Sequence, residues 1–242
     1  MKKKLRAFYV VVLITGMASA VFSSCKKDGT VDTGYSYFPD AIGHYCIYDV
    51  DSTVYDDFNN DTVVYRYEVK EIIESYFTDN QGRQAMRVER YRKNYSDTVP
   101  YANQPWTISR VWSFVRTSSE AEKQEENQRY IRLTFVPREG KTWNGNAYNT
   151  LGEMDYKYAS VDQPYSLNAM NFDSVATVLQ EDETNLITRK FYQERYARNV
   201  GMIEKSIIDV HGRTDTLILS PVMGRITGGV VCNFRLVDWG PR

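Results

Sequence analysis

The sequence predicts an all-β protein: a single antiparallel sheet of about ten strands, curled into a barrel or an open half-barrel. Two observations predict this class. Apolar and polar side chains alternate along most of the chain, with the period of two that a half-buried strand requires. Turns rich in Asp, Asn and Gly, such as "DDFNND" and "DNQG", separate the alternating runs, so neighbouring strands are expected to pair antiparallel. A two-sheet β-sandwich is the alternative arrangement of the same strands.

The alternation is clearest in "TVVYRYEVK", where Val63, Tyr65, Tyr67 and Val69 share one face of the predicted strand. Two later runs, "RYIRLTFV" and "GGVVCNFRLV", repeat this pattern. The predicted strands cover residues 45–50, 62–70, 85–91, 106–114, 129–136, 154–159, 175–179, 187–196, 202–210, 216–219 and 228–237. Because one face of each strand is apolar, the sheet must close on itself or pack against a second layer.

Two stretches need a separate interpretation. The charged segment "SSEAEKQEENQ" is helix-prone, and we interpret it as a solvated hairpin excursion with room for one helical turn. Trp106, Trp112 and Phe114 share a strand face and are expected in the core. An aromatic-lined cavity for a sugar or an apolar ligand is the alternative role for such rings.

The first residues predict export and lipidation. A basic start is followed by the short apolar run "AFYVVVLI" and by small residues, which together are the parts of a secretory signal peptide. The run is too short for a transmembrane helix. Because Cys25 follows "FSS" directly, the site resembles a bacterial lipobox with Phe22 in place of the usual leucine. The resemblance implies a chain cut before Cys25 and a lipid on its thiol, whereas an ordinary signal would leave a free thiol.

These features divide the chain into a signal peptide (residues 1–24), a lipidated tether (25–36) and a β domain (37–242). The signal peptide holds four basic residues and no acidic ones, so the remainder has 26 basic against 31 acidic residues and a net charge of −5. This balance argues against a nucleic-acid partner. Lys26, directly after Cys25, is not the acidic residue of an inner-membrane retention signal, so lipid anchoring in the outer membrane is expected, on either leaflet.

Four segments carry a family resemblance. "YFPDAIGHYCIYDVDSTVY", "GKTWNGNAYN", "YARNVGMIEK" and the closing "LVDWG" resemble corresponding parts of a family of Bacteroidota outer-membrane lipoproteins with no assigned activity. The resemblance implies an envelope lipoprotein with a β domain. Where the family pattern has tryptophan, this chain has Cys46, which suggests a position facing the core. Cys46 and Cys232 are therefore expected to be buried free thiols, with a disulfide as the alternative.

No catalytic constellation is evident, so we predict a non-enzymatic protein without a cofactor or a metal. The two histidines, His44 and His211, are too few for a zinc site, and no G-x-S-x-G segment accompanies them. "DDFNNDTVVYRYE" has the oxygen spacing of a calcium loop, but Thr62 stands where the sharp turn needs glycine. A solvated acidic turn is the preferred interpretation.

Two sets of candidate site residues remain. Trp143 and Tyr148 lie in the Gly- and Asn-rich segment "TWNGNAYN", and an exposed aromatic loop is a candidate ligand site. Five Asp-Ser/Thr triplets resemble the acceptor motif for O-glycosylation in Bacteroidota envelopes, and they suit turn-to-strand junctions equally well. Their candidate acceptors are Ser52, Thr62, Thr98, Ser174 and Thr216.

The sequence thus predicts a membrane-anchored envelope lipoprotein that acts as a binding or structural module. Two alternatives from other classes stay open. A half-barrel could carry a lipid or another hydrophobic ligand, which would need a continuous apolar cavity. A glycan-active hydrolase would need two carboxylates facing each other in a cleft.

Overall fold

The computed structural model describes residues 32–95, 98–213 and 221–241. They belong to one compact unit, Thr33–Arg242, and the account below concerns this unit. The predicted signal peptide, Cys25, the predicted strand 216–219 and Thr216 lie outside the described residues.

The described residues form an all-β unit with three short 3-10 helices, and the barrel or half-barrel class is confirmed. The 3-10 helices are η2 (Tyr35–Tyr37), η3 (Tyr101–Asn103) and η4 (Val222–Gly224). The strands are β1 (Tyr45–Asp56), β2 (Asp61–Thr78), β3 (Gln84–Asn94), β4 (Thr107–Arg116), β5 (Glu120–Glu125), β6 (Gln128–Thr134), β7 (Thr142–Asn144), β8 (Asp155–Leu167), β9 (Met170–Thr184), β10 (Thr188–Ala197), β11 (Gly201–Gly212) and β12 (Ile226–Gly240).

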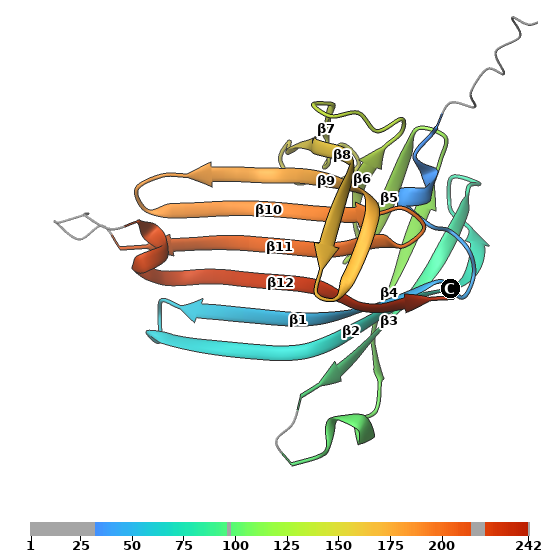
Figure 1. Cartoon of the computed structure of the whole chain (residues 1–242). Helices are drawn as coiled ribbons and strands as arrows, with labels where there is room; N and C mark the ends of the chain where they lie inside the picture. Colours follow the sequence, from blue (N-terminus) through green and yellow to red (C-terminus); the bar gives the residue numbers. More distant parts are fainter. Residues whose placement is uncertain (1–31, 96–97, 214–220, 242) are drawn as a thin grey trace, which may run out of the picture. The chain divides into compact units, whose positions relative to one another are not determined.

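All twelve of these strands lie in one antiparallel sheet with the order β6-β5-β4-β3-β2-β1-β12-β11-β10-β9-β8-β7 (Figure 1). Strands adjacent in sequence pair with each other, except β6 and β7, which form the two edges of the sheet, and β1 pairs with β12. The two edges of the sheet come together, because the N–H of Ile131 on β6 donates to the carbonyl of Gly145, just after β7 (2.9 Å). The sheet is therefore nearly closed into a barrel.

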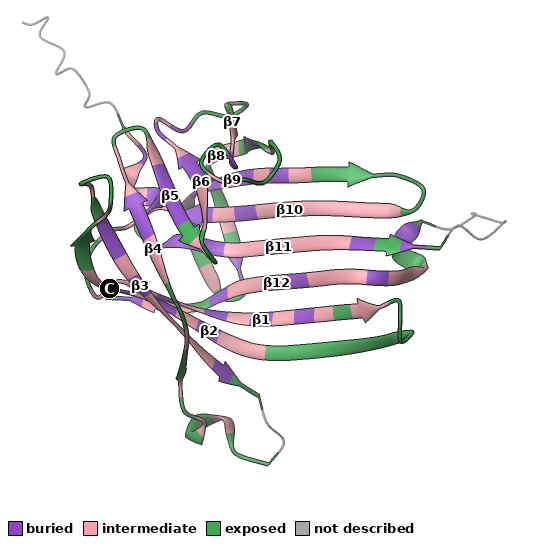
Figure 2. Cartoon of the chain, turned by 180° about the vertical axis from the view of Figure 1, so that it is seen from behind, coloured by how far each residue is buried: buried purple, intermediate pink, exposed green. Residues whose placement is uncertain are grey.

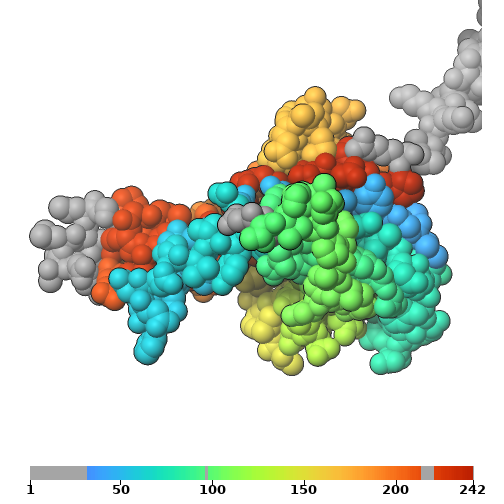
Figure 3. Space-filling view, turned by 90° about the horizontal axis from the view of Figure 1, so that it is seen from below, coloured from blue at the N-terminus to red at the C-terminus, as the bar shows by residue number. Residues whose placement is uncertain are grey.

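Strand length divides the sheet into two parts. Figures 1 and 3 show β9–β12, β1 and β2 running well past the other strands as an arm one sheet thick. On β2, pairing with β3 ends at Tyr67, whereas pairing with β1 continues to Asp61. On β9, pairing with β8 ends at Leu179, whereas pairing with β10 continues to Thr184. The arm is thus an open half-barrel that continues the wall of the closed part.

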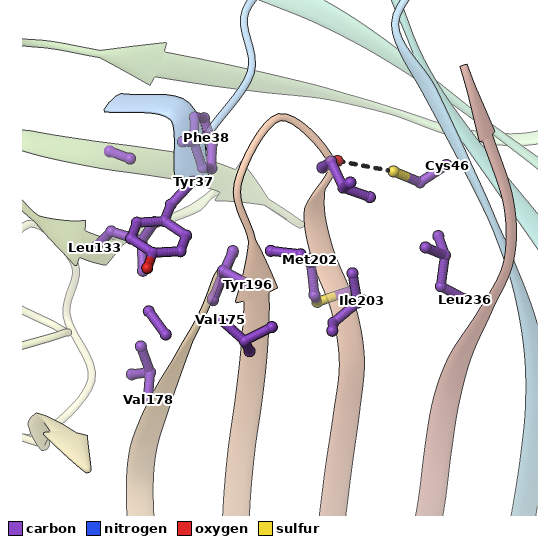
Figure 4. Close-up of a cluster of buried hydrophobic side chains, with 14 of the residues drawn as sticks. Tyr37, Phe38, Cys46, Leu133, Val175, Val178, Tyr196, Met202, Ile203 and Leu236 are labelled. Carbon is purple, nitrogen blue, oxygen red and sulfur yellow. Dashed lines mark hydrogen bonds between the residues drawn. The ribbon is translucent and has the colours of Figure 1, made fainter. Parts of the chain in front are cut away.

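Inside the closed part lies the hydrophobic core. We call the face that carries Val50, Val69 and Val88, all at most 2% exposed, the inner face. The core also holds residues of β5, β6 and β8–β11 (Figure 4). Near η2, the side chains of Phe38 and Phe114 pack against each other, with ring centroids 5.6 Å apart. This apolar packing fills one end of the barrel.

A second layer covers part of the outer face. The hairpin formed by the end of β8 and the start of β9 lies across β10–β12 (Figure 1). The ring of Phe172 packs on Trp239, with centroids 5.8 Å apart, and Tyr165 donates its hydroxyl to Glu204 (2.8 Å). These contacts hold the hairpin on β11 and β12.

Two expectations need correction. The charged segment 118–128 forms a hairpin as expected but holds no helical turn: it contains β5 and the turn to β6, where Glu126 and Asn127 are exposed and both adopt positive φ as in a tight hairpin turn. It is solvated only in part, because Ala121, Glu122 and Lys123 are buried. The compact unit also begins before the predicted boundary at residue 37. The ring of Tyr35 stacks edge-on against Phe135 (4.8 Å), so the last residues of the predicted tether belong to the folded unit.

Candidate functional site

Charged side chains and one tryptophan form two groups of contacts on the inner face of the barrel, and the charge of Lys123 in one group acts on Glu125 and Glu194 in the other. We call the two groups together the inner-face ring. Its members come from seven strands, and each contacts at least one other member. They are Glu71, Arg90, Trp112, Lys123, Glu125, Arg132, Glu194 and Lys205.

Glu194 on β10 holds one side of this ring together. Its carboxylate lies 3.1 Å from Nζ of Lys205 and 3.7 Å from the guanidinium of Arg132. It also accepts a hydrogen bond from the hydroxyl of Tyr196 (2.5 Å). Arg132 bonds in addition to Glu125 (3.0 Å). The carboxylate is almost fully buried, so these partners must replace the water it has lost.

The same contacts shift the pKa values of this group. Burial by itself would raise the pKa of Glu194, but the charges of Lys205, Arg132 and Lys123 outweigh it and lower the pKa. The pKa of Glu125 is also lowered, because the same cations outweigh its burial. Burial would lower the pKa of Arg132, but the two carboxylates raise it well above its usual value. All three side chains are therefore held in their charged forms.

Arg90 on β3 forms the other side of the ring. Its guanidinium lies 4.6 Å from the ring centroid of Trp112 and 5.7 Å from that of Phe234. Its Nε is 3.4 Å from Glu71, which also lies 3.9 Å from Lys123. Two buried donors here have no acceptor among the described residues, Nε1 of Trp112 and Nε of Arg132, and the contact of Arg90 Nε with Glu71 is too poorly placed to count as a hydrogen bond. Such donors are costly when left unpaired.

An apolar surface continues from the ring onto the arm, and strand register defines it. Residues directly opposite each other across β10, β11, β12, β1 and β2 form rows on the inner face. The first row is Glu194, Lys205, Phe234, Val50 and Tyr67; the second is Tyr192, Ile207, Cys232, Ser52 and Tyr65; the third is Lys190, Asp209, Val230, Val54 and Val63.

We call the large apolar side chains of these rows, with the buried Val50 left out, the inner wall. They are Val54, Val63, Tyr65, Tyr67, Tyr192, Ile207, Val230 and Phe234. Val54, Val63 and Tyr65 are 36%, 37% and 47% exposed, although tyrosine and valine favour burial against a second layer. Figure 2 shows the arm as mostly half-buried or exposed. The inner wall is therefore an uncovered apolar surface within the described part of the chain.

The outer face of the same strands differs. One row is apolar and crosses Phe191, Ile208, Val231, Thr53 and Val64. The next row toward the barrel is polar, with Gln193, Ser206, Asn233, Asp51 and Arg66. The apolar surface is thus broader on the inner face, where it spans neighbouring rows.

The closed end of the barrel offers little space. A cavity of about 50 Å³ lies among Phe38, His44, Cys46 and Phe114. Burial lowers the pKa of His44 despite its bond to the carbonyl of Val200, which favours the neutral imidazole. A volume of this size admits a water molecule or two, so this cavity is far too small for an acyl chain.

A polar groove lies on the outer face over β3–β5. One part of it has about 530 Å³ and the other about 390 Å³, and the two share Phe77, Ser113 and Gln124. Arg87 and Arg110 line the first part, while Asp79 and Glu122 line the second. The volumes are typical of ligand sites. Phe77 is 42% exposed and presents an aromatic surface there.

The two carboxylates of this groove do not form a catalytic pair. Arg83 bonds both of them, at 2.9 Å to Asp79 and 2.6 Å to Glu122. The backbone N–H of Arg83 is the main reason that the pKa of Asp79 is lowered. A glycosidase needs one carboxyl group with a raised pKa to act as the acid, whereas the pKa of Asp79 is lowered.

The structure places Trp143 differently from its predicted role. Its Nε1–H donates to the carbonyl of Ile131 (3.0 Å), and its ring packs on Tyr158 (4.8 Å). Trp143 therefore closes the barrel and is not an exposed loop side chain. Tyr148 is 44% exposed, and its ring lies under the guanidinium of Arg129 (4.1 Å). The sequence correctly placed Tyr148 on the surface.

The candidate acceptors for O-glycosylation fall into different environments. Ser52 is buried on the inner face of β1 beside Cys232, so the expectation that it is an exposed acceptor is wrong. Ser174 is half-buried and bonded to Asp162 and Tyr37. Thr62 and Thr98 are exposed.

Cys46 and Cys232 are buried free thiols, as the preferred interpretation of the sequence expected, and they form no disulfide. Burial raises the pKa of the Cys46 thiol to about 12, and the thiol donates to the carbonyl of Val200 (Figure 4).

In the described ranges, His, Cys, Asp and Glu side chains form no group of three that could hold a metal ion. These ranges also contain no helix that is long and apolar enough to span a membrane.

Comparison with known proteins gives no match: no family model, no curated protein and no solved structure is similar to this chain.

Sequence reasoning missed the inner-face ring. Its charged members come from strands that are distant in sequence. Some of these strands alternate apolar and charged residues, as an ordinary strand with one solvent-exposed face does. The only local signal was Glu194, which has the same period-two position as Tyr192 and Tyr196.

Proposed function

We propose that this chain is an envelope lipoprotein that acts as a ligand-binding module, with the inner face of its open half-barrel as the binding surface. The lipobox-like start supports export and anchoring through Cys25 in the outer membrane. The uncovered inner wall supports ligand binding, because a soluble domain rarely leaves a broad apolar surface without a function. The ligand would lie along the arm, with its apolar part on the wall.

The observation that carries this proposal is the neighbouring inner-face rows with large apolar side chains on the arm. The cavity at the closed end of the barrel is too small for a hydrophobic ligand, but a ligand on the arm would lie outside the closed barrel and would not need this cavity. The arm therefore makes the carrier of a hydrophobic ligand the preferred form of binding module. The chain would hold such a ligand on an open surface.

Val63 and Val64 offer a matched test. They are adjacent on β2 and both exposed, at 37% and 56%, but they face opposite sides of the sheet. The uncharged fluorescent probe N-phenyl-1-naphthylamine should bind the full chain with enhanced emission. Val63→Asp should weaken this binding about tenfold, because it places a charge in the apolar surface, whereas Val64→Asp should leave it unchanged. Equal binding by both variants would contradict the proposal.

The anchor is tested separately. Cys25→Ser should remove the thiol that bears the lipid, so the protein should move from the membrane fraction to the soluble envelope fraction. If the variant sediments with membranes as the wild type does, the anchoring proposal fails.

A second candidate is glycan binding in the outer groove. Its volume and the exposed ring of Phe77 favour this function, since sugars stack on aromatic faces and bond to planar polar side chains. Phe77→Ala should then abolish retention on immobilised envelope polysaccharide. Unchanged retention would remove this candidate.

A further inference from the structure

We infer that the inner-face ring binds an anionic group at the end of the ligand, so that the ligand is an anionic amphiphile whose apolar body lies on the inner wall. This inference rests on the proposed function and adds the chemical class of the ligand. Carboxylate, sulfonate and phosphate end groups share the required chemistry.

The charges of the ring leave one cation in excess. Arg90, Lys123, Arg132 and Lys205 face the three carboxylates of Glu71, Glu125 and Glu194. Glu71 serves both Arg90 and Lys123, at 3.4 and 3.9 Å, and the second of these is the longest ion-pair distance in the ring. A partly buried excess of positive charge is relieved by an anion.

The unpaired donors give an independent reason. Nε1 of Trp112 and Nε of Arg132 are buried without an acceptor among the described residues, and Nε of Arg90 forms no hydrogen bond, with only the long 3.4 Å ion-pair contact to Glu71. The side chain of Arg132 is only 6% exposed, so it has given up most of its contact with water. The oxygens of one anionic group could accept from the guanidinium of Arg90 and from the indole beneath it, and such charge-assisted bonds are among the stronger ones in proteins.

The ring and the inner wall are continuous. The first inner-face row contains Glu194 and Lys205 of the ring together with Phe234 and Tyr67 of the wall. Phe234 also lies 5.7 Å from the guanidinium of Arg90. Arg90 and Lys205 are 18% and 19% exposed, so solvent reaches the ring. One molecule could therefore place its charged end on the ring and its chain on the wall.

The test compares decanoate, decanol and acetate on the full chain with ¹⁵N-labelled tryptophan indoles. Decanoate should shift the Nε1–H resonance of Trp112, assigned through Trp112→Phe, and should bind at least tenfold more tightly than decanol. The resonance of Trp143 is the internal control, because its N–H is already donated to Ile131. Acetate should shift Trp112 only at far higher concentration, since it lacks the apolar body.

Arg90→Gln and Arg87→Gln form a matched pair on β3, because Arg87 lies on the outer face and pairs with Glu74 and Glu89. Arg90→Gln should weaken decanoate binding about tenfold and leave decanol binding unchanged, while Arg87→Gln should change neither.

The outcomes separate the two proposals. Equal affinity for decanoate and decanol, or an unshifted Trp112 in wild-type protein saturated with decanoate, would overturn the anionic class alone. Failure of both compounds to bind would overturn the proposed function as well. The wild-type spectrum decides the question even if Arg90→Gln does not fold.

Discussion

The indole N–H of Trp143 donates to the backbone carbonyl of Ile131 at 3.0 Å, and this bond joins the two edges of the sheet. Ile131 in turn donates its own N–H to the carbonyl of Gly145. Trp143 is on β7 and Ile131 on β6, the strands at opposite ends of the sheet order. A side-chain bond and a backbone bond thus join the two edges where a full ladder of backbone bonds would otherwise run.

Trp143→Phe should destabilise the unit by about 1–2 kcal/mol, since it removes this hydrogen bond and leaves the carbonyl of Ile131 without that donor. Urea unfolding followed by circular dichroism measures the change. Tyr148→Phe is the control, because it removes only a surface bond to Glu120 and should cost less than about 0.5 kcal/mol. Equal stability of the two variants would mean that Trp143 does not close the barrel.

Glu194→Gln should destabilise the protein by about 3 kcal/mol at pH 7, because it leaves the buried Arg132 and the half-buried Lys205 beside an uncharged amide. The pKa of Glu194 is lowered in the folded state. Its ionised form therefore stabilises the protein above the unfolded pKa, and this contribution is lost as the pH falls through the folded value. The stability difference between wild type and variant should shrink as the pH is lowered below about 4.5. A difference that stays constant down to pH 2 would contradict the assignment.

Cys46 and Cys232 should resist thiol reagents in the native state. Burial raises the pKa of both thiols, to about 12 for Cys46, and the thiolate is the reactive form. In the Cys25→Ser background, iodoacetamide at pH 8 should add nothing to native protein and two groups in 6 M guanidinium. Addition of two groups to native protein would contradict the burial of the thiols, and none after unfolding would indicate a disulfide.

If the triplets are glycosylated in the native host, the exposed hydroxyls of Thr62 and Thr98 should carry the glycan and the buried Ser52 should not. Peptide mapping by mass spectrometry distinguishes the three sites. Asp61→Ala and Asp97→Ala should each remove one equal mass increment. Modification of Ser52 would show that transfer precedes folding, and an intact mass equal to that from a host lacking the pathway would leave the triplets as turn chemistry.

Alternation along the chain predicted the architecture because most strands bury one face. It failed at β5 and β7 for different reasons. On β5, Lys123 and Glu125 point inward and are neutralised by Glu71 and Arg132 on distant strands, so a buried strand has the composition of a surface helix. On β7, three residues are too few to show a period.

The candidate site shows the same limit. Val63, Tyr65 and Tyr67 were placed on one face from the sequence, and the register confirms that they lie in consecutive inner-face rows. The sequence did not predict how far β2 extends beyond β3, because that length depends on where the pairing between the two strands stops. By alternation, Ile108 should share the core face predicted for Trp106, Trp112 and Phe114, yet it is 55% exposed. A register shift between β3 and β4 at Arg90 and Tyr91 breaks the alternation near it.

Photoaffinity labelling tests the central claim most directly, because it locates the ligand without relying on a variant. A long-chain alcohol with a diazirine at the end of its chain would be irradiated with the full chain, and the labelled residues mapped by mass spectrometry. The account predicts labels on the inner wall, at Tyr65, Tyr67 and Val230. Labels confined to Phe77 and Val111 in the outer groove would contradict it.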